Sequence, residues 1–262
     1  MSTLTHAVRD STTMLRRNLL HMRRYPSLTL NLLLTPVMLL LVFVYIFGGA
    51  MSAGIGGGGD RSDYLAYVFP GILMLTIGGT TIGSAVSIAM DMNEGIIARF
   101  RTMAIHRGSV LIGHVIGSVL QCVMSVTLVG AVAVAIGFRS TDATVLEWIL
   151  AFGLLALVSL ALTWVAVGMG LSSPNVEAAS NNALPLMLLP MLGSAFVPVD
   201  AMPGWFQPIA EYQPFTPAIE TLRGLLLGTE IGHNGWLAVA WCVALAVLGY
   251  VWSKSLFNRD PK

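Results

Sequence analysis

The sequence predicts an all-α, polytopic membrane protein that forms a single domain over residues 1–262. Three observations predict this fold class. The chain is 55% hydrophobic and only 10% charged, with a mean hydropathy of +0.77, whereas soluble domains carry about 25% charged residues. Long apolar runs alternate with short polar segments. Lysine and arginine gather in every second polar segment, as they do between membrane spans.

We expect six transmembrane helices, because each of six apolar runs has about the 20 residues needed to cross roughly 30 Å of hydrocarbon. The predicted spans are residues 28–47, 65–89, 109–137, 146–171, 179–199 and 235–257. Pro185 and Pro190 interrupt the fifth run. A span tolerates proline where neighbouring helices or hydroxyl side chains satisfy the freed carbonyl groups.

The basic residues predict that both termini lie in the cytoplasm. With the N-terminus inside, eleven of the 14 basic residues fall in inner segments and the other three fall outside. The inner residues are Arg9, Arg16, Arg17, Arg23, Arg24, Arg99, Arg101, Arg107, Lys254, Arg259 and Lys262, and the outer ones are Arg61, Arg139 and Arg223. An even number of spans agrees with this orientation.

Residues 4–24 are expected to form an amphipathic helix that lies on the inner membrane face. Leu4, Val8, Leu15 and Leu19 share one stripe at helical spacing, and the arginines lie away from it. Charge alone fits a solvated basic tail equally well, and the apolar stripe favours the interfacial helix.

Residues 90–107 are expected to form a second amphipathic helix, in the inner connection between the second and third spans. Arg99 and Arg101 flank its apolar stripe, while Asp91 and Glu94 stand at its N-terminal end, where carboxylates suit the helix dipole. The stripe consists of Ile96, Ile97, Phe100, Met103 and Ala104. Such a helix suits either a groove on a cytoplasmic protein or the membrane surface, and the pattern alone does not choose between them.

The second span carries a line of hydroxyl groups on one face. The residues of this line are Thr76, Thr80, Ser84 and Ser87, followed by Asp91. The line is compatible both with a substrate cavity and with packing on other helices. Two glycine pairs at GxxxG spacing, Gly79 with Gly83 and Gly113 with Gly117, are expected to support close helix packing.

The outer segment 203–228 predicts short half-helices at the membrane edge. Pro203 and Pro217 suit the first turn of a helix, and the apolar part is too short to cross the membrane. Glu220 and Arg223 are three residues apart and can pair on one helix face. Glu211, Glu220 and Arg223 are therefore expected to be partly sheltered groups of an outer cap.

The sequence contains no recognisable catalytic set, so we expect no enzyme activity in this chain. The glycine run at 56–59 lacks the lysine that a phosphate-binding loop requires. His106 and His114 have no neighbouring cysteine to complete a metal site. The predicted spans contain no deeply placed charge, which argues against a proton-driven pump. Energy is then expected to come from a partner chain.

Two segments resemble one family. NEGIIARFRTMAIHR (residues 93–107) resembles the first cytoplasmic loop of ABC-2 type transporter permeases, in which Glu-x-Gly precedes a basic, apolar helix. MPGWFQPIAEYQPFTPAIETLRGLL (residues 202–226) resembles the late signature of that family, with Gln213-Pro214 where Asn-Pro is usual. The six spans and the basic N-terminal helix also match. Within the family, the daunorubicin-resistance permeases are the most similar subgroup.

The resemblance implies an exporter subunit that works with a separate ATP-binding subunit and a second permease copy, a homodimer or a heterodimer. ATP and magnesium would bind to the partner, and this chain would bind no cofactor, metal or nucleic acid. The cargo would be a hydrophobic or amphipathic, drug-like compound that leaves across the bacterial plasma membrane. Exporters of polysaccharide or lipid-linked glycan, and a membrane scaffold or sensor, are the alternatives.

The resemblance also assigns roles to residues. The expected coupling residues, which would meet the ATP-binding subunit, are Asp91, Glu94, Gly95, Arg99, Phe100, Arg101 and Arg107. The expected substrate path would run between permease copies, along Thr76, Thr80 and Ser84 of the second span and Asn181, Asn182 and Phe196 of the fifth. The outer cap would close the exit.

Overall fold

The computed structural model describes residues 26–48, 61–95, 107–139 and 142–258, and every regular element in these ranges is helical. The predicted interfacial helix 4–24 lies outside the described residues, as do Arg99, Phe100 and Arg101. The long helices are α2 (Pro26–Val42), α4 (Arg61–Asn93), α6 (Arg107–Ala135), α7 (Val145–Ser172) and α11 (Asn234–Asn258), and α8 (Val176–Leu188) has 13 residues. The shorter elements are η1 (Phe43–Phe47), η3 (Leu189–Leu192), η4 (Val199–Ala201), α9 (Gln207–Tyr212) and α10 (Phe215–Leu227).

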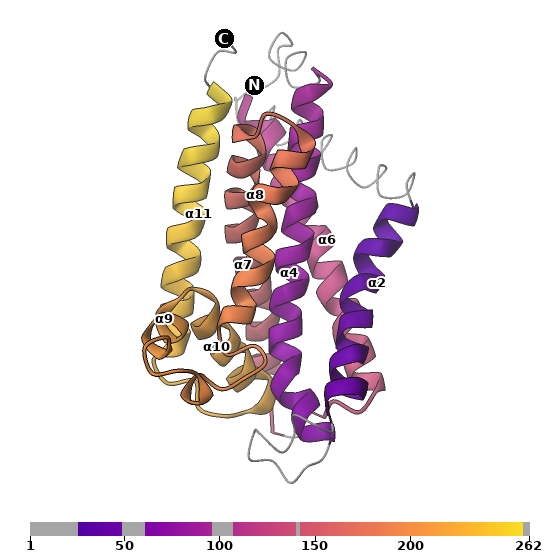
Figure 1. Cartoon of the computed structure of the whole chain (residues 1–262), viewed down its shortest axis with the longest axis vertical. Helices are drawn as coiled ribbons and strands as arrows, with labels where there is room; N and C mark the ends of the chain where they lie inside the picture. Colours follow the sequence, from indigo (N-terminus) through magenta and orange to yellow (C-terminus); the bar gives the residue numbers. More distant parts are fainter. Residues whose placement is uncertain (1–25, 49–60, 96–106, 140–141, 259–262) are drawn as a thin grey trace.

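The long helices run side by side and give the molecule two ends (Figure 1). At one end, drawn at the top, α4 finishes and α6 begins, and we name it the loop end. At the opposite end, drawn at the bottom, α9 and α10 gather beside the start of α4 and the start of α11, and we name it the cap end. Among the described residues, α4, α6, α7 and α11 run from one end to the other.

Four helices are long and apolar enough to cross a membrane, namely those at 62–93, 111–135, 145–172 and 234–258. They match the second, third, fourth and sixth predicted spans. The first predicted span corresponds to α2 and the π-helical turn η1, of which residues 34–47 form a shorter apolar helix. The described helices therefore establish a multi-pass architecture.

The fifth predicted span, residues 179–199, differs from the structure. The helix α8 begins earlier, at Val176, tightens into the 3-10 turn η3 at Leu189, and ends at Leu192. Pro190 lies at the start of this turn, and Gly193 then has extended backbone angles. Proline supplies no N–H for a helical hydrogen bond, so the regular helix gives way at Leu188, eleven residues before the predicted end, and the 3-10 turn ends seven residues before it.

The helix α4 lies at the centre of the fold. It contacts α2, α6, α7, α8 and α10. Within its most apolar stretch 72% of the residues are buried, against 17% for α11. The helix α4 is therefore enclosed by protein, whereas α11 presents most of its surface to the surroundings, which for an apolar helix are lipid.

Close backbone contact holds α4 against the fifth helical segment. A Cβ atom on Gly71 would collide with the backbone of Ala195, and one on Gly78 would collide with the backbone at Leu186 and Met187. Of the two expected packing pairs, Gly79 and Gly83 make no such contact within this chain, because a Cβ atom on either would meet no atom within 4 Å, while the pair Gly113 and Gly117 stays a prediction. Small residues do bring helices together here, but at Gly71 and Gly78.

Exposed aromatic side chains mark the cap end. Trp205, Tyr212 and Trp236 are 76%, 59% and 65% exposed, and all three lie in or beside α9 and the start of α11. Tryptophan and tyrosine concentrate where a membrane meets water. The cap end therefore has the character of a membrane–water interface.

Two short helices occupy the segment predicted to form half-helices. The helix α10 has 13 residues, about 20 Å of rise, which is too short to cross a bilayer. Pro217 lies in its first turn as expected, but Pro203 opens no helix, since α9 begins at Gln207. Gly228 ends α10 in the left-handed conformation (φ +69°), directly against the backbone of Asp142.

Candidate functional site

The candidate site is the helix α4 together with the groups that it holds at its two ends. Its 33 residues span about 50 Å, which is longer than the hydrocarbon core of a bilayer. One end carries a polar contact with α6, and the other carries a polar contact with α10. One unbroken helix therefore joins the loop end to the cap end.

At the loop end, Asp91 of α4 pairs with His114 of α6. Oδ2 of Asp91 lies 2.8 Å from Nε2 of His114, and the two residues are only 7% and 8% exposed. Asp91 lies in the last turn of α4, and His114 lies two turns into α6. The pair ties the two helices together at the base of the connection between them.

This position differs from the expected one. Residues 90–93 continue α4, so Asp91 belongs to the end of a long helix and not to the start of a separate helix over 90–107. Its carboxylate is turned into the protein and is almost fully buried.

Glu94 and Gly95 form the turn that follows α4. Glu94 donates its backbone N–H to Met90 O, Gly95 donates to Met92 O, and Gly95 has a φ of +69°. This left-handed glycine bends the chain away from the helix. Glu94 is exposed, so its carboxylate is available to a partner. Arg107 is the first residue of α6.

In the middle of α4, the predicted path hydroxyls are buried and bonded to their own helix. Thr76 Oγ1 donates to Ile72 O at 2.7 Å, Thr80 Oγ1 to Ile77 O at 2.8 Å, and Ser84 Oγ to Thr80 O at 3.4 Å. These back-bonds satisfy the hydroxyl donors without a ligand. Of the two interpretations of the hydroxyl line, a substrate cavity or packing on other helices, this arrangement favours packing.

The structure does not bring the hydroxyl line and the predicted residues of the fifth span together. Gly78 faces α8, and residues two positions away point about 200° around the helix, so Thr76 and Thr80 point away from α8. Asn181 and Asn182 are exposed on α8, where Asn182 Nδ2 donates to Ser173 Oγ at 3.0 Å. Phe196 lies beyond η3 and stacks on Phe43, with 4.3 Å between ring centroids.

A different strip of α4 reaches the surface of the chain. Its residues are at least partly exposed and lie within an arc of about 100° beside the face that packs on α8. They are Gly79, Ile82, Gly83, Val86 and Met90. The neighbouring helix α8 exposes Asn181, Asn182, Leu184 and Leu188. We name these nine residues the α4–α8 surface. Sequence reasoning missed its α4 part because the strip carries no polar group.

At the cap end, Arg223 of α10 joins three segments. Its Nη1 donates to Glu220 Oε1, which confirms the predicted pair, and its Nη2 donates to Tyr67 O at 3.2 Å and to Ser194 O at 2.8 Å. Its Cζ lies 4.0 Å from the centre of the Tyr67 ring. We name Tyr67, Ser194, Glu220 and Arg223 the Arg223 junction. Glu211 is exposed on α9 and takes no part in it.

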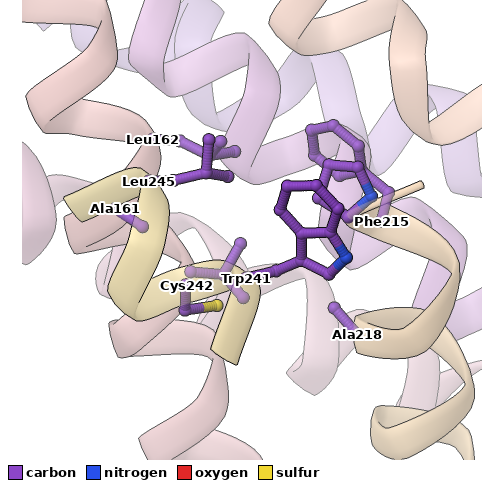
Figure 2. A pocket seen from close by; sticks show the side chains of 9 residues that line it. Ala161, Leu162, Phe215, Ala218, Trp241, Cys242 and Leu245 are labelled. Carbon is purple, nitrogen blue, oxygen red and sulfur yellow. The ribbon is translucent and has the colours of Figure 1, made fainter. Parts of the chain in front are cut away.

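An apolar hollow lies between α7, α10 and α11. Figure 2 shows Leu162 and Leu245 on one side of it and Trp241 and Phe215 on the other. All nine side chains that line it are apolar. A ligand site usually adds a few polar groups that fix orientation, so the hollow alone does not define a substrate site.

Comparison with known proteins agrees with this architecture. A family model for the ABC-2 type transporter matches residues 10–227. A daunorubicin resistance ABC transporter permease protein of Streptomyces coeruleorubidus is 28% identical over 85% of this chain and 77% of its own length. A probable doxorubicin resistance ABC transporter permease protein of Mycobacterium tuberculosis is 24% identical over 68% of this chain and 67% of its own.

A third relative, Nodulation protein J of Rhizobium meliloti, is 25% identical over 82% of each chain. The family model spans α4 and both of its ends, since residues 10–227 include α4, the start of α6 and α10. With a bundle of membrane-length helices and a family match over most of its residues, this multi-pass membrane permease belongs to the ABC-2 type transporter family.

Proposed function

We propose that this chain is the permease subunit of an ATP-driven exporter that carries hydrophobic or amphipathic, drug-like compounds across the bacterial plasma membrane. A separate ATP-binding subunit supplies the energy, with ATP and magnesium bound on that subunit. One observation carries the proposal: α4 continues without a break from the turn at Glu94 to the Arg223 junction. A push on the loop end is therefore carried toward the cap end by one continuous helix, in which Pro70 is the residue most suited to a bend.

The proposal places the loop end in the cytoplasm and the cap end outside. The excess of basic residues in the segments assigned to the inside supports this orientation. The four long helices, together with α2 with η1 and α8 with η3, make six crossings and leave both termini in the cytoplasm.

The ATP-binding subunit docks on the connection between α4 and α6. Glu94 is exposed at the start of this connection, and Arg107 begins the helix at its other side. The sequence between them combines apolar residues with Arg99, Phe100 and Arg101, a composition that suits a groove on a soluble protein. Asp91 contributes from inside, by holding α4 to α6.

The substrate path follows the α4–α8 surface, which a second permease copy encloses. Its side chains are glycines and apolar groups, with Asn181 and Asn182 as hydrogen-bonding groups. Such a lining suits an amphipathic compound, because the apolar surface provides affinity and the amides fix orientation. The names of two relatives, which refer to daunorubicin and doxorubicin resistance, support a drug-like cargo.

The test is export of daunorubicin, followed by its fluorescence, from cells that express the permease with its ATP-binding subunit. We expect ATP-dependent export, and we expect Glu94→Ala to reduce it by at least fivefold while the protein remains in the membrane. Equal accumulation with the intact protein and with Glu94→Ala would argue against docking at this turn. Absence of any solute movement, with an unchanged ATPase rate in the partner, would favour a scaffold or sensor.

A further inference from the structure

The Arg223 junction is a set of contacts that the proposed docking and path do not use. We propose that Arg223 is a positioning residue that fastens α10 to α4, so that the outer cap moves with α4 when the ATP-binding subunit acts. This inference rests on the proposed function and adds the means by which the exit opens and closes.

The first argument is that the junction joins elements that are distant in the sequence. Arg223 on α10 binds the carbonyl of Tyr67 on α4 and the carbonyl of Ser194 in the chain that follows η3. The hydroxyl of Tyr67 donates to the same Ser194 oxygen at 3.2 Å. One guanidinium group therefore attaches the short cap helix both to the central helix and to the end of the fifth helical segment.

The second argument is chemical. A guanidinium group presents several N–H donors in a flat fork, so it can bind a carboxylate and two carbonyls while its face lies on an aromatic ring. The Arg223 side chain makes all of these contacts and is 12% exposed. A lysine ammonium is a point charge, so it can keep the Glu220 pair but does not reproduce the stacked, forked arrangement.

The third argument comes from polar atoms beside these contacts. Within the described ranges, Nε of Arg223, the hydroxyl of Ser194 and Oε1 of Gln213 are buried and have no hydrogen-bond partner. Buried polar groups without partners are unfavourable, and proteins keep few of them. Because the contact already holds these unpaired atoms, its attachment depends on the hydrogen bonds that Arg223 does make, and their loss is expected to loosen α10 from α4.

The contact is also tight. A Cβ atom on Gly193 would collide with the side chains of Gln213 and Thr216, and Thr216 Oγ1 accepts the backbone N–H of Ser194 at 3.4 Å. The start of α10 is therefore fitted to the end of the fifth segment without spare room. A movement of α4 that shifts Tyr67 must either carry α10 with it or break the contacts of Arg223.

The experiment compares Arg223→Gln and Arg223→Lys with Arg139→Gln in the complete complex with its ATP-binding subunit in liposomes. Arg139 is a matched control at the same end, and the carbonyls that it binds, of Val134 and Phe138, belong to its own segment. We expect Arg223→Gln to lower daunorubicin export about tenfold while ATP hydrolysis stays within twofold of the intact complex. Arg223→Lys should show an intermediate loss, and Arg139→Gln should show none.

Spin labels at Asp63→Cys and Glu230→Cys report the attachment itself, because both positions are exposed and flank the junction. We expect one narrow distance in the nucleotide-free and ATP-trapped intact complex, and a broad distribution with Arg223→Gln. Normal export by Arg223→Gln, or an unchanged distance distribution, would overturn the inference. A parallel loss of export, hydrolysis and thermal stability would also overturn it, because that result describes a structural role alone.

Two further outcomes are also decisive. If Arg223→Gln does not fold, Arg223→Lys decides, and export at the intact rate by that variant overturns the inference. If the intact complex exports nothing in the presence of ATP, the proposed function fails. In that case the spin-label distances still test whether Arg223 attaches α10 to α4, because they do not depend on export.

Discussion

Asp91 and His114 form a buried pair, with 2.8 Å between Oδ2 and Nε2, although 23 residues separate them in the sequence. The pair closes the base of the connection between α4 and α6. A force applied to that connection is therefore shared by two helices and does not act on α4 alone.

Asp91→Asn and His114→Gln are each expected to lower the free energy of unfolding by about 1 kcal/mol, because an amide oxygen accepts a hydrogen bond less strongly than a carboxylate, and because glutamine does not reproduce the shape of the imidazole. The double variant should lose less than the sum of the single variants. Thermal unfolding of the purified protein in detergent measures all three. Strictly additive losses would show that the two side chains do not interact.

Glu94→Gln is the matched control for Asp91→Asn. Glu94 is exposed in the turn after α4, so its substitution should change the free energy of unfolding by less than about 0.5 kcal/mol. Under the proposed function, it should still weaken binding of the ATP-binding subunit, measured by pull-down of that subunit with the permease. A large loss of stability in Glu94→Gln would contradict the exposed position of Glu94 in the turn after α4.

Gly78→Ala and Gly79→Ala test the contact between α4 and α8. The added methyl group at position 78 meets the backbone of α8, and we expect a loss of about 2 kcal/mol, typical of an overpacked site. The same change one residue later meets no atom within 4 Å and should be neutral or stabilising, since alanine favours helix. Equal thermal stability of the two variants would show that α8 does not lie against Gly78.

Gly228→Ala and Gly232→Ala separate backbone strain from steric contact. Both glycines have positive φ, so alanine should cost roughly 1 kcal/mol at either position. Only position 228 adds a collision, with Asp142, and its loss should be larger by at least about 1 kcal/mol. Urea or thermal unfolding in detergent distinguishes the two, and a larger loss at position 232 would contradict this geometry.

Thr144 begins α7 with a capping box. Its hydroxyl accepts the N–H of Glu147, and the Glu147 carboxylate accepts the N–H of Thr144 at 2.6 Å. Thr144→Ala should cost about 1 kcal/mol, and Thr144→Ser should restore most of it. Thr127→Ala serves as the control, because that exposed hydroxyl bonds only within α6. An equal loss of thermal stability in Thr144→Ala and Thr127→Ala would contradict the role of Thr144 as a helix cap.

Hydropathy predicted the long helices well, because a run of apolar residues in α4, α7 or α11 identifies a span wherever its neighbours lie. The Glu220–Arg223 pair was also predictable, since both residues lie on one helix. The partner of Asp91 was not, because His114 meets it only after α4 and α6 pack together.

Glycine spacing was misleading for a similar reason. Gly79 and Gly83 have the familiar spacing but face open space in this chain, whereas Gly71 and Gly78, seven residues apart, touch the backbone of a neighbour. Spacing states which residues share a face of a helix, but the fold decides which face is covered. The hydroxyl line of α4 shows the same limit, since its direction became known only with the position of α8.

The central place of α4 has a consequence for how the chain is made. Its partners α7, α8 and α10 all follow it in the sequence, and at ribosomal speed α10 is synthesised on the order of ten seconds later. During that interval α4 has lipid or the insertion machinery as its surroundings. Because Thr76 and Thr80 bond to carbonyls of their own helix, these hydroxyl groups need no partner from α7, α8 or α10 during that interval. Substitutions that replace these threonines by asparagine or glutamine should therefore reduce the yield of inserted protein.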